Sequence, residues 1–425
     1  MGMTIAEKAF AKAAGLETVH PGQYVDAKID RIIADEEFYR IHAAAVSGGL
    51  EEGIPRIWDK DRFHVILEHF QPSLNDMQSV RQQHMRKVAE QYGVKYFQDS
   101  ICGVIHQITV ERYVLPGELS LGADSHSCMW GALNCVGTGM GEHELAYAIC
   151  FGKLWFKVPS TIKIIMEGKL SKWADPKDVA FYLSKKYTAS FGLYKSLEFT
   201  GPGAKAMSLS NRMTIAAHAV ELGAKFGIFE YDEKTGEFLD RRTELRDQLE
   251  KAVPIAADPD ARYEQEIVLN LDEIEPLVAK PHNFENIGTL DEVAGIPIHQ
   301  AQVGSCADGR VEDIRAVAAI LKGKKVHKNT RLFVQPASWT VYRDCMAEGL
   351  FDIILESGAQ ILSPGCHLCL GMQGRLGDNE NCITCTTRNH KGRLGGKNSN
   401  IYLANPKVIA ACAIAGEIID VREAF

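Results

Sequence analysis

Residues 300–322 read QAQVGSCADGRVEDIRAVAAILK, in which a short strand-like run is followed by a polar turn and an amphipathic segment. This pattern predicts a strand over Gln300–Gly304 and a helix over Val311–Lys322. Strands that alternate with helices in this way form parallel sheets, so the stretch predicts an α/β fold. The alternation continues, with further strands predicted over Arg331–Gln335 and Ala359–Leu362 and a further helix over Thr340–Gly349.

The chain of 425 residues is too long for one typical domain, and its pattern divides it into three stretches. We expect three doubly wound α/β domains around a central cleft, over residues 1–160, 161–285 and 286–425. An acidic, proline-containing segment at about 272–297 resembles an interdomain connector. Strands are also predicted over Phe63–Leu67, Ile101–Ile105, Leu119–Gly122, Thr161–Met166 and Glu266–Leu271.

Polar residues directly follow five of the predicted strands. In open α/β sheets, ligands bind beyond the carboxyl ends of the strands, so these residues are expected to face one shared cleft. Their side chains are of the types that transfer protons or bind metals. The five groups are Glu68 with His69, His106 with Gln107, Asp124-Ser125-His126, Ser305 with Cys306, and Pro364-Gly365-Cys366.

The composition excludes several classes of function. Lys and Arg total 47 against 55 for Asp and Glu, a net charge of −8 without long runs of one sign, which does not indicate nucleic-acid binding. No apolar run approaches the roughly 20 residues that cross a bilayer, and the N-terminus, with capping-box spacing at Thr4 and Glu7, does not resemble a signal peptide. We therefore expect a cytoplasmic protein. Its 11 cysteines then favour thiolate or metal chemistry over disulfides.

Two cysteine pairs allow a structural zinc site. Cys366-x2-Cys369 and Cys382-x2-Cys385 have the spacing of a zinc ribbon, which would make the chain a non-catalytic binding module. A ribbon needs hairpin knuckles, whereas the segment between the pairs, LGMQGRLGDNEN, is rich in glycine and shows no alternating strand.

The alternative combines Cys306 with Cys366 and Cys369 as three ligands of a [4Fe–4S] cluster. Such a cluster normally takes four thiolates, so a set of three leaves one iron open to water or substrate. An open iron is a Lewis acid that can bind a hydroxyl and a carboxylate together.

Several motifs resemble those of the aconitase and isopropylmalate isomerase superfamily of hydro-lyases. The matches follow the family's order and together reach from about residue 20 to 415. FGKLWFKVPSTIKI is most similar to the isopropylmalate and homoaconitate branch. The other motifs are GVIHQITVERYVLPGELSLGADSH (103–126), MTIAAHAVELGAK (213–225), VGSCADGRVED (303–313), PGCHLCLGM (364–372) and TTRNHKGR (386–393).

The resemblance implies a role for each matched residue. Expelling hydroxide near neutral pH needs an acid beside the leaving oxygen, and an imidazole tuned by a carboxylate has a suitable pKa. A guanidinium matches the planar geometry of a substrate carboxylate. The implied cluster ligands are Cys306, Cys366 and Cys369; Arg388 and Arg393 would bind substrate carboxylates; His69 backed by Glu68, and His106 backed by Asp124, would manage protons; and His126 and Glu221, the latter on a helix over 213–224, would complete the site.

The chain departs from the family pattern at several positions. Glu68 stands where Asp is usual, Ala217 and Thr387 stand where Asn is common, and Ala307-Asp308 replace Thr-Asn after the first cluster cysteine. Cys385 is an additional thiol. These changes preserve the cluster ligands but put the exact substrate in doubt.

The resemblance also implies a partner and a class of substrate. Members of this superfamily use a further swivelling domain that carries the base for the carbon-bound proton, and this chain has no room for it. We therefore expect a separate small subunit, in a heterodimer or heterotetramer. The implied substrate is a 2-hydroxy di- or tricarboxylate, with 3-isopropylmalate, as in leucine biosynthesis, favoured over the substrates of homoaconitase or of a 2,3-dimethylmalate dehydratase.

Overall fold

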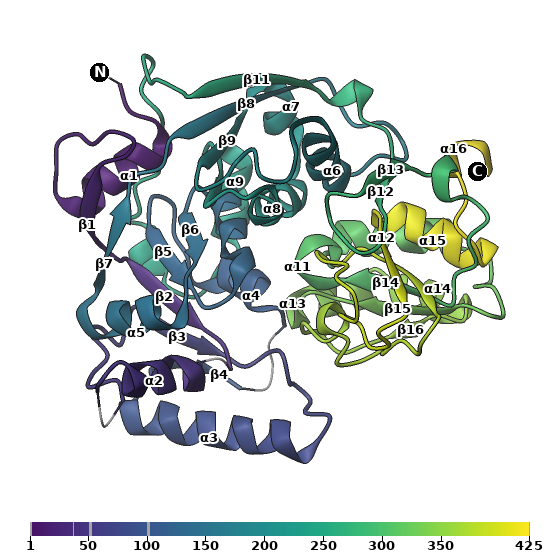
Figure 1. Ribbon diagram of the computed structural model, residues 1–425, viewed down its shortest axis with the longest axis horizontal. Coiled ribbons are helices and arrows are strands. Elements are labelled where there is room, and N and C mark those ends of the chain that lie inside the picture. Colours follow the sequence, from purple (N-terminus) through teal and green to yellow (C-terminus); the bar gives the residue numbers. More distant parts are fainter. Residues whose placement is uncertain (1, 37, 51–52, 100–102, 425) are drawn as a thin grey trace. The chain divides into compact units, whose positions relative to one another are not determined.

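The computed structural model describes residues 2–36, 38–50, 53–99 and 103–424 (Figure 1). The chain forms two compact units, each built from segments that are distant in sequence. Unit 1 comprises residues 1–101, 108–167 and 192–269, and unit 2 comprises 102–107, 168–191 and 270–425. The strands form three main sheets and one two-stranded ribbon, and the division into three domains stays a prediction.

The first sheet of unit 1 has five parallel strands in the order β4-β3-β2-β5-β6. The predicted strands at 63–67 and 119–122 are confirmed. The prediction at 101–105 is wrong where it can be judged, because a helix, α4, begins at Ile105; residues 101 and 102 lie outside the described ranges. The strands are β2 (Arg31–Ala34), β3 (Phe63–Ile66), β4 (Tyr96–Gln98), β5 (Leu119–Gly122) and β6 (Val136–Gly139).

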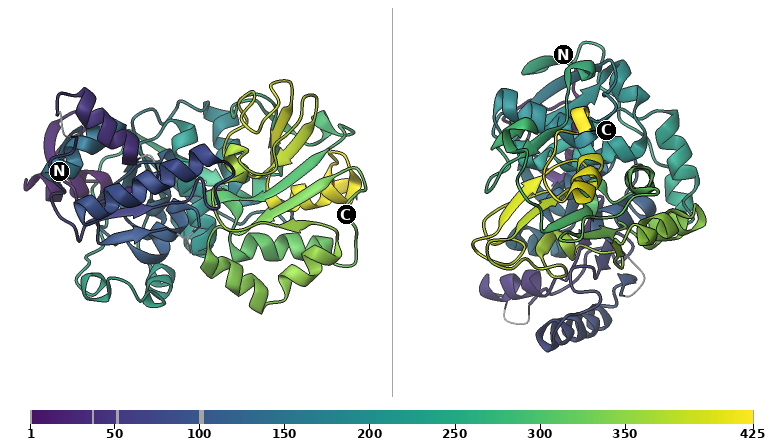
Figure 2. Two further views of the ribbon diagram at one scale, coloured as in Figure 1. Left: turned by 90° about the horizontal axis from the view of Figure 1, so that it is seen from below. Right: turned by 90° about the vertical axis from the view of Figure 1, so that its right-hand side faces the viewer.

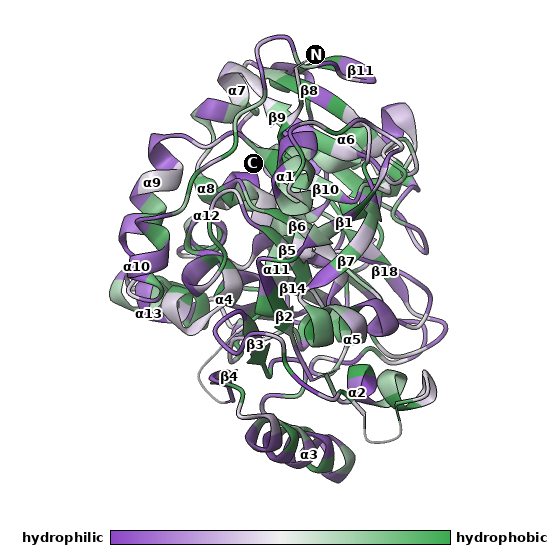
Figure 3. Ribbon diagram, turned by 90° about the vertical axis from the view of Figure 1, so that its left-hand side faces the viewer, coloured by the Kyte–Doolittle hydropathy of each residue, from purple (hydrophilic) through white to green (hydrophobic). Residues whose placement is uncertain are grey.

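Helices and an antiparallel ribbon complete this part of unit 1. The capping box at Thr4 and Glu7 is present, and Gly15 ends the first helix in the left-handed conformation. Figure 3 shows apolar residues concentrated on β2 and β3 and polar residues on α3. The elements are α1 (Ile5–Ala14), α2 (Phe38–Ser47), α3 (Asp76–Tyr92), α4 (Ile105–Arg112), the 3-10 helix η1 (Ser125–Leu133), α5 (Glu142–Phe151), and the ribbon of β1 (Tyr24–Lys28) with β7 (Lys153–Lys157).

The second sheet of unit 1 has the order β10-β9-β8-β11, and β8, β9 and β10 run parallel. The strands predicted from Thr161 and up to Leu271 are confirmed to within a residue. The helix expected over 213–224 is interrupted, because α8 ends at Ala217 and a separate 3-10 turn, η2, carries Glu221. The elements are β8 (Thr161–Glu167), β9 (Ser196–Thr200), α7 (Gly201–Ala206), α8 (Leu209–Ala217), η2 (Val220–Leu222), β10 (Phe226–Phe229), α9 (Glu233–Asp240), α10 (Arg246–Leu249) and β11 (Gln265–Asn270).

Unit 2 is built on a seven-stranded sheet in the order β13-β12-β18-β17-β14-β15-β16. The five strands from β18 to β16 are parallel, whereas β12 runs antiparallel to both of its neighbours. The segment at 272–297 is therefore not a simple connector, since it supplies β12 and β13. The strands are β12 (Leu277–Ala279), β13 (Ile287–Thr289), β14 (Gln300–Gly304), β15 (Arg331–Gln335), β16 (Gln360–Ile361), β17 (Asn381–Thr384) and β18 (Asn400–Leu403).

Helices cover the sheet of unit 2. Figure 2, in its left view, shows the helical segment from α12 to α14 along one face of the strands. Apolar side chains such as Val317, Leu332, Ile354 and Ile409 form the core between helices and sheet. The helices are α6 (Pro176–Tyr187), α11 (Ser305–Asp308), α12 (Val311–Leu321), α13 (Trp339–Ala347), α14 (Leu350–Glu356), α15 (Pro406–Ala415) and α16 (Val421–Ala424).

This topology decides where functional residues gather. Because β14 to β18 are parallel, their carboxyl ends lie at one edge of the unit 2 sheet, and the ends of β2, β3, β5 and β6 lie at one edge of the first unit 1 sheet. In the described ranges, no helix has the length and apolar character that a bilayer crossing needs.

Candidate active site

The three predicted cluster cysteines of unit 2 lie at the carboxyl edge of its sheet. Cys306 lies in α11, directly after β14, and Cys366 and Cys369 lie in the loop after β16. Their exposed fractions are 3%, 7% and 4%, so all three thiols are buried. Buried thiols that follow parallel strands at one edge of a sheet are a suitable donor set for a metal cluster.

The loop that carries Cys366 and Cys369 is tied to the end of β15 through Gln335. The Gln335 side-chain amide donates to the Ser363 carbonyl oxygen at 2.9 Å, and its oxygen accepts from the Leu368 N–H at 3.3 Å. A Cβ at Gly304, the neighbour of Gln335 in the register, would lie 2.5 Å from the Gln335 carbonyl oxygen. Glycine is therefore required at 304, immediately before the turn with Cys306.

The loop after β17 brings the arginine motif to the same thiols. Arg393 Nη2 donates to Cys369 Sγ at 3.3 Å, and Thr387 Oγ1 lies 3.8 Å from that sulfur. A cation beside sulfur favours the thiolate, which is the form that binds metals. Arg388 is half-buried in this loop.

The second cysteine pair is used in the fold. Cys382 is buried within β17, and Cys385 Sγ accepts from the Gly304 N–H at 3.1 Å. Burial raises the pKa of both thiols. Among the described residues, no group of metal-ligating side chains within 4.8 Å of one another combines this pair with Cys366 and Cys369, which argues against a zinc ribbon.

The departure at Asp308 has a partner within unit 2. Lys177, on α6, has no exposed surface, and its Nζ lies 3.2 Å from Asp308 Oδ2 and donates to the Cys385 carbonyl oxygen at 2.8 Å. The ion pair thereby joins α6 to the exits of β14 and β17.

His106 is also held in unit 2, because the first three residues of α4, 105–107, belong to that unit and the rest of the helix to unit 1. The Val104 N–H donates to the Ala337 carbonyl oxygen at 2.8 Å, and Gly103 forms a bridge with Ser338, so the exit of β15 anchors the start of α4. A ring nitrogen of His106 lies within 4.8 Å of Cys306 Sγ.

Unit 1 contains the other predicted proton-transfer residues, and it pairs His126 with Glu221. His126 Nε2 lies 2.9 Å from Glu221 Oε1, with both side chains largely buried. Asp124 caps η1 by accepting from the His126 N–H, and its carboxylate lies 3.8 Å from His126 Nδ1. The expected pairing of Asp124 with His106 joins the two units and stays a prediction.

His69 lies among carboxylates that follow β2, β3 and β5. Its Nε2 is 3.5 Å from both Glu68 and Asp124, and its Nδ1 faces Asp35 and Glu36. Burial lowers the pKa of His69, but these carboxylates outweigh burial and raise it well above its usual value. Burial raises the pKa of Glu68, which has 1% exposure.

The sequence motifs did not reveal Asp35 and Glu36. Both carboxylates are buried, with exposed fractions of 1% and 0%. The run Ala34-Asp35-Glu36-Glu37 reads as a solvated acidic turn. The signal that could have found them is their position directly after β2, a strand too short and too mixed in composition to predict.

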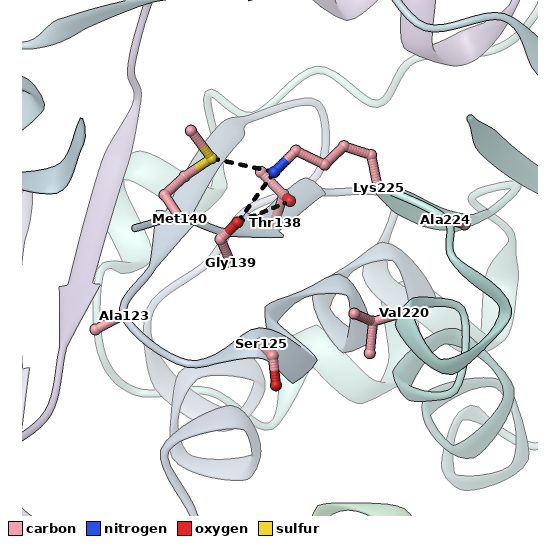
Figure 4. A pocket seen from close by; sticks show the side chains of 8 residues that line it. All are labelled: Ala123, Ser125, Thr138, Gly139, Met140, Val220, Ala224 and Lys225. Carbon is pink, nitrogen blue, oxygen red and sulfur yellow. Dashed lines mark hydrogen bonds between the residues drawn. The ribbon is translucent and has the colours of Figure 1, made fainter. Parts of the chain in front are cut away.

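Unit 1 contains a pocket of about 310 Å³ (Figure 4). Its lining includes Ser125 and Val220, which directly precede His126 and Glu221 in the sequence. Lys225 extends to the opposite wall, where its Nζ lies 3.2 Å from the Gly139 carbonyl oxygen and 3.3 Å from Met140 Sδ. Burial lowers the pKa of this ammonium.

Comparison with known proteins agrees with this arrangement. The family model of the aconitase family (aconitate hydratase) matches residues 63–295 and 286–416. The chain belongs to the aconitase family. This membership confirms the resemblance and the hydro-lyase class predicted from the motifs.

Aconitase-family relatives match the whole chain. The "3-isopropylmalate dehydratase large subunit" of Caldanaerobacter subterraneus subsp. tengcongensis is 40% identical, with 100% of both chains covered. The protein named "3-isopropylmalate dehydratase large subunit 2" of Archaeoglobus fulgidus is also 40% identical over 100% of both chains. Crystalline aconitase X from Thermococcus kodakaraensis has a TM-score of 0.52 at 12% identity, covering 90% of this chain and 89% of its own, which confirms the aconitase-like α/β fold.

Proposed function

We propose that this aconitase-family chain is the large subunit of an iron–sulfur hydro-lyase that dehydrates 3-isopropylmalate and rehydrates the product. The observation that carries the proposal is the set of buried thiols at one sheet edge of unit 2, with an arginine donating to Cys369. The full-length relatives named as 3-isopropylmalate dehydratase large subunits support the substrate.

The residues present fit a [4Fe–4S] cluster with three protein ligands. Cys306, Cys366 and Cys369 are buried, and they follow parallel strands of one sheet. When bound, such a cluster supplies a Lewis-acidic iron for the substrate hydroxyl and a carboxylate.

The arginine motif is assigned to substrate carboxylates. Arg388 and Arg393 follow β17 in one loop, and Arg393 already contacts Cys369. A guanidinium binds a carboxylate through two parallel hydrogen bonds, which fixes its orientation as well as its position.

The imidazole–carboxylate groups are assigned to proton transfer at the leaving oxygen. Glu221 stabilises a protonated His126 across 2.9 Å, and the carboxylates around His69 favour its protonated form. Either imidazolium can donate a proton to departing hydroxide, and His106 is a third imidazole available for this task.

The proton on the adjacent carbon requires a base from elsewhere. We assign this base to a separate small subunit, since the relatives of this chain carry the words "large subunit" in their names. The active species is then a heterodimer or heterotetramer.

The test is anaerobic purification of the chain, iron and sulfide analysis, and turnover with the small subunit encoded by the same organism. We expect about four irons per chain, a brown chromophore, and dehydration of 3-isopropylmalate in preference to homocitrate and 2,3-dimethylmalate. Stoichiometric zinc without a chromophore, or preference for another hydroxy acid, would contradict the assignment.

A further inference from the structure

Four carboxylates lie around the imidazole of His69, although one would be enough to act as its proton partner. Nε2 lies 3.5 Å from Glu68 and 3.5 Å from Asp124, whereas Nδ1 faces Asp35 at 3.5 Å and Glu36 at 3.3 Å. The four carboxylates come from three loops, which follow β2, β3 and β5. The two ring nitrogens therefore have different sets of partners.

Glu36 contacts both the ring of His69 and the backbone of the loop that carries it. Its Oε2 makes the hydrogen bond with His69 Nδ1, and its Oε1 accepts from the Phe70 N–H at 3.2 Å. The side chain has no exposed surface. One carboxylate thus binds both the ring of His69 and the backbone of the next residue, which fixes the ring relative to the loop after β3.

We infer that Glu36 is the positioning residue that holds His69 with Nδ1 protonated and Nε2 directed toward Glu68 and Asp124. A carboxylate that accepts from one imidazole nitrogen fixes the tautomer and leaves the other nitrogen to exchange the proton. The inference rests on the proposed role of His69 in proton transfer and adds a residue that the motifs do not contain.

The test is Glu36→Gln in the cluster-loaded large subunit combined with its small subunit. The amide keeps the shape but loses the charge, and its NH2 group, which cannot accept a hydrogen bond, replaces one of the two oxygens that accept from His69 and Phe70. We expect kcat to fall at least 10-fold with KM within twofold, unchanged iron content and an unchanged melting temperature. The basic limb of the kcat profile should move to lower pH, although Asp35, Glu68 and Asp124 still face the ring.

Glu198→Gln is the matched control. Glu198, on β9, is 1% exposed, and it too accepts from one backbone N–H, that of Ile5, and from one side chain, the Tyr263 hydroxyl. We expect its kcat within twofold of the parent. If Glu36→Gln leaves kcat unchanged, or loses iron content and stability together with activity, the inference is overturned.

Two further variants separate this inference from the proposed function. Glu36→Asp retains the carboxylate, and its kcat should lie above that of Glu36→Gln. His69→Asn should abolish turnover. If His69→Asn is inactive while Glu36→Gln has parental kcat and pH profile, only the positioning role is wrong; if His69→Asn is fully active, the proposed role of His69 is wrong.

Discussion

The two units use the same device for different chemistry. In both, most of the side chains assigned to the reaction follow parallel strands at one edge of a sheet. Unit 1 presents imidazoles and carboxylates there, whereas unit 2 presents thiols and guanidinium groups. In unit 1 His69 and His126 both lie beside carboxylates, which favour the protonated imidazole. In unit 2 a cation balances a thiol, which favours metal binding. A fold can thus divide a reaction between a proton-handling edge and a metal-binding edge.

Of the changes considered, replacement of a cluster ligand should cause the largest loss of activity. In Cys369→Ser, the oxygen that replaces Sγ is a poor ligand for iron, and the contact with Arg393 loses its sulfur. We expect loss of the visible absorption and at least a 100-fold loss of activity. Cys412→Ser, at a fully buried cysteine of α15, is the control and should keep the chromophore. If Cys369→Ser is brown and active, Cys369 is not a cluster ligand, and unit 2 does not have the metal-binding role proposed for it.

Replacing a carboxylate of unit 1 should lower activity but leave the cluster in place. Glu221→Gln removes the charge that stabilises protonated His126, so kcat should fall by about 10² to 10⁴, the usual contribution of general acid–base catalysis. The cluster absorption should be unchanged. Glu233→Gln, on the exposed start of α9, should have parental activity. Loss of iron from Glu221→Gln would show that the two edges do not act separately.

Much of the strand framework could be predicted, because β3 and β15 contain apolar runs and β14 lies within an alternation of short strand-like and helical segments. The three-residue strands β12 and β13 could not be predicted in this way. β12 and β13 lie in an acidic, proline-containing segment, and their pairing depends on β18, which is more than 100 residues later in the chain. Local composition cannot show a partner so distant in sequence.

The candidate site could be predicted where a motif carried it, and not where only packing did. Cys306, His126 and Arg393 belong to recognisable sequence patterns. Glu36 has no such pattern, because a buried glutamate and a solvated one look the same in the sequence. The helix expected around Glu221 is broken between α8 and η2, and that break places the carboxylate beside His126.

The buried ion pair of unit 2 gives a prediction about stability. In Lys177→Met, the buried carboxylate of Asp308 loses the ammonium that lies 3.2 Å away, and removing one partner of a buried ion pair usually costs about 3–5 kcal/mol. Chemical denaturation should show this loss of unfolding free energy. In Lys177→Met/Asp308→Asn no charge is left unpaired, so part of the stability should return. If the double variant is no more stable than the single one, the pair is not what joins these strand exits.

A further effect depends on pH and concerns Asp178, which accepts from the Leu277 N–H and from Asn405 in unit 2. Burial raises its pKa from 3.8 to about 7, so the folded protein keeps a proton that the unfolded chain loses near pH 4. The folded state then binds more protons than the unfolded state between these two values. Its contribution to stability must therefore decrease as pH rises through this window, by about 1.4 kcal/mol per pH unit.

Asp178→Asn cannot ionise, so the difference in unfolding free energy between the parent and this variant isolates the effect. We expect the parent to lose stability relative to Asp178→Asn between pH 5 and 7, and the difference to be constant above about pH 8. Parallel stability curves would mean that Asp178 ionises at its ordinary pKa. The carboxylates of unit 2 would then tolerate burial as charged groups, unlike Glu68 beside His69 in unit 1, where burial raises the pKa.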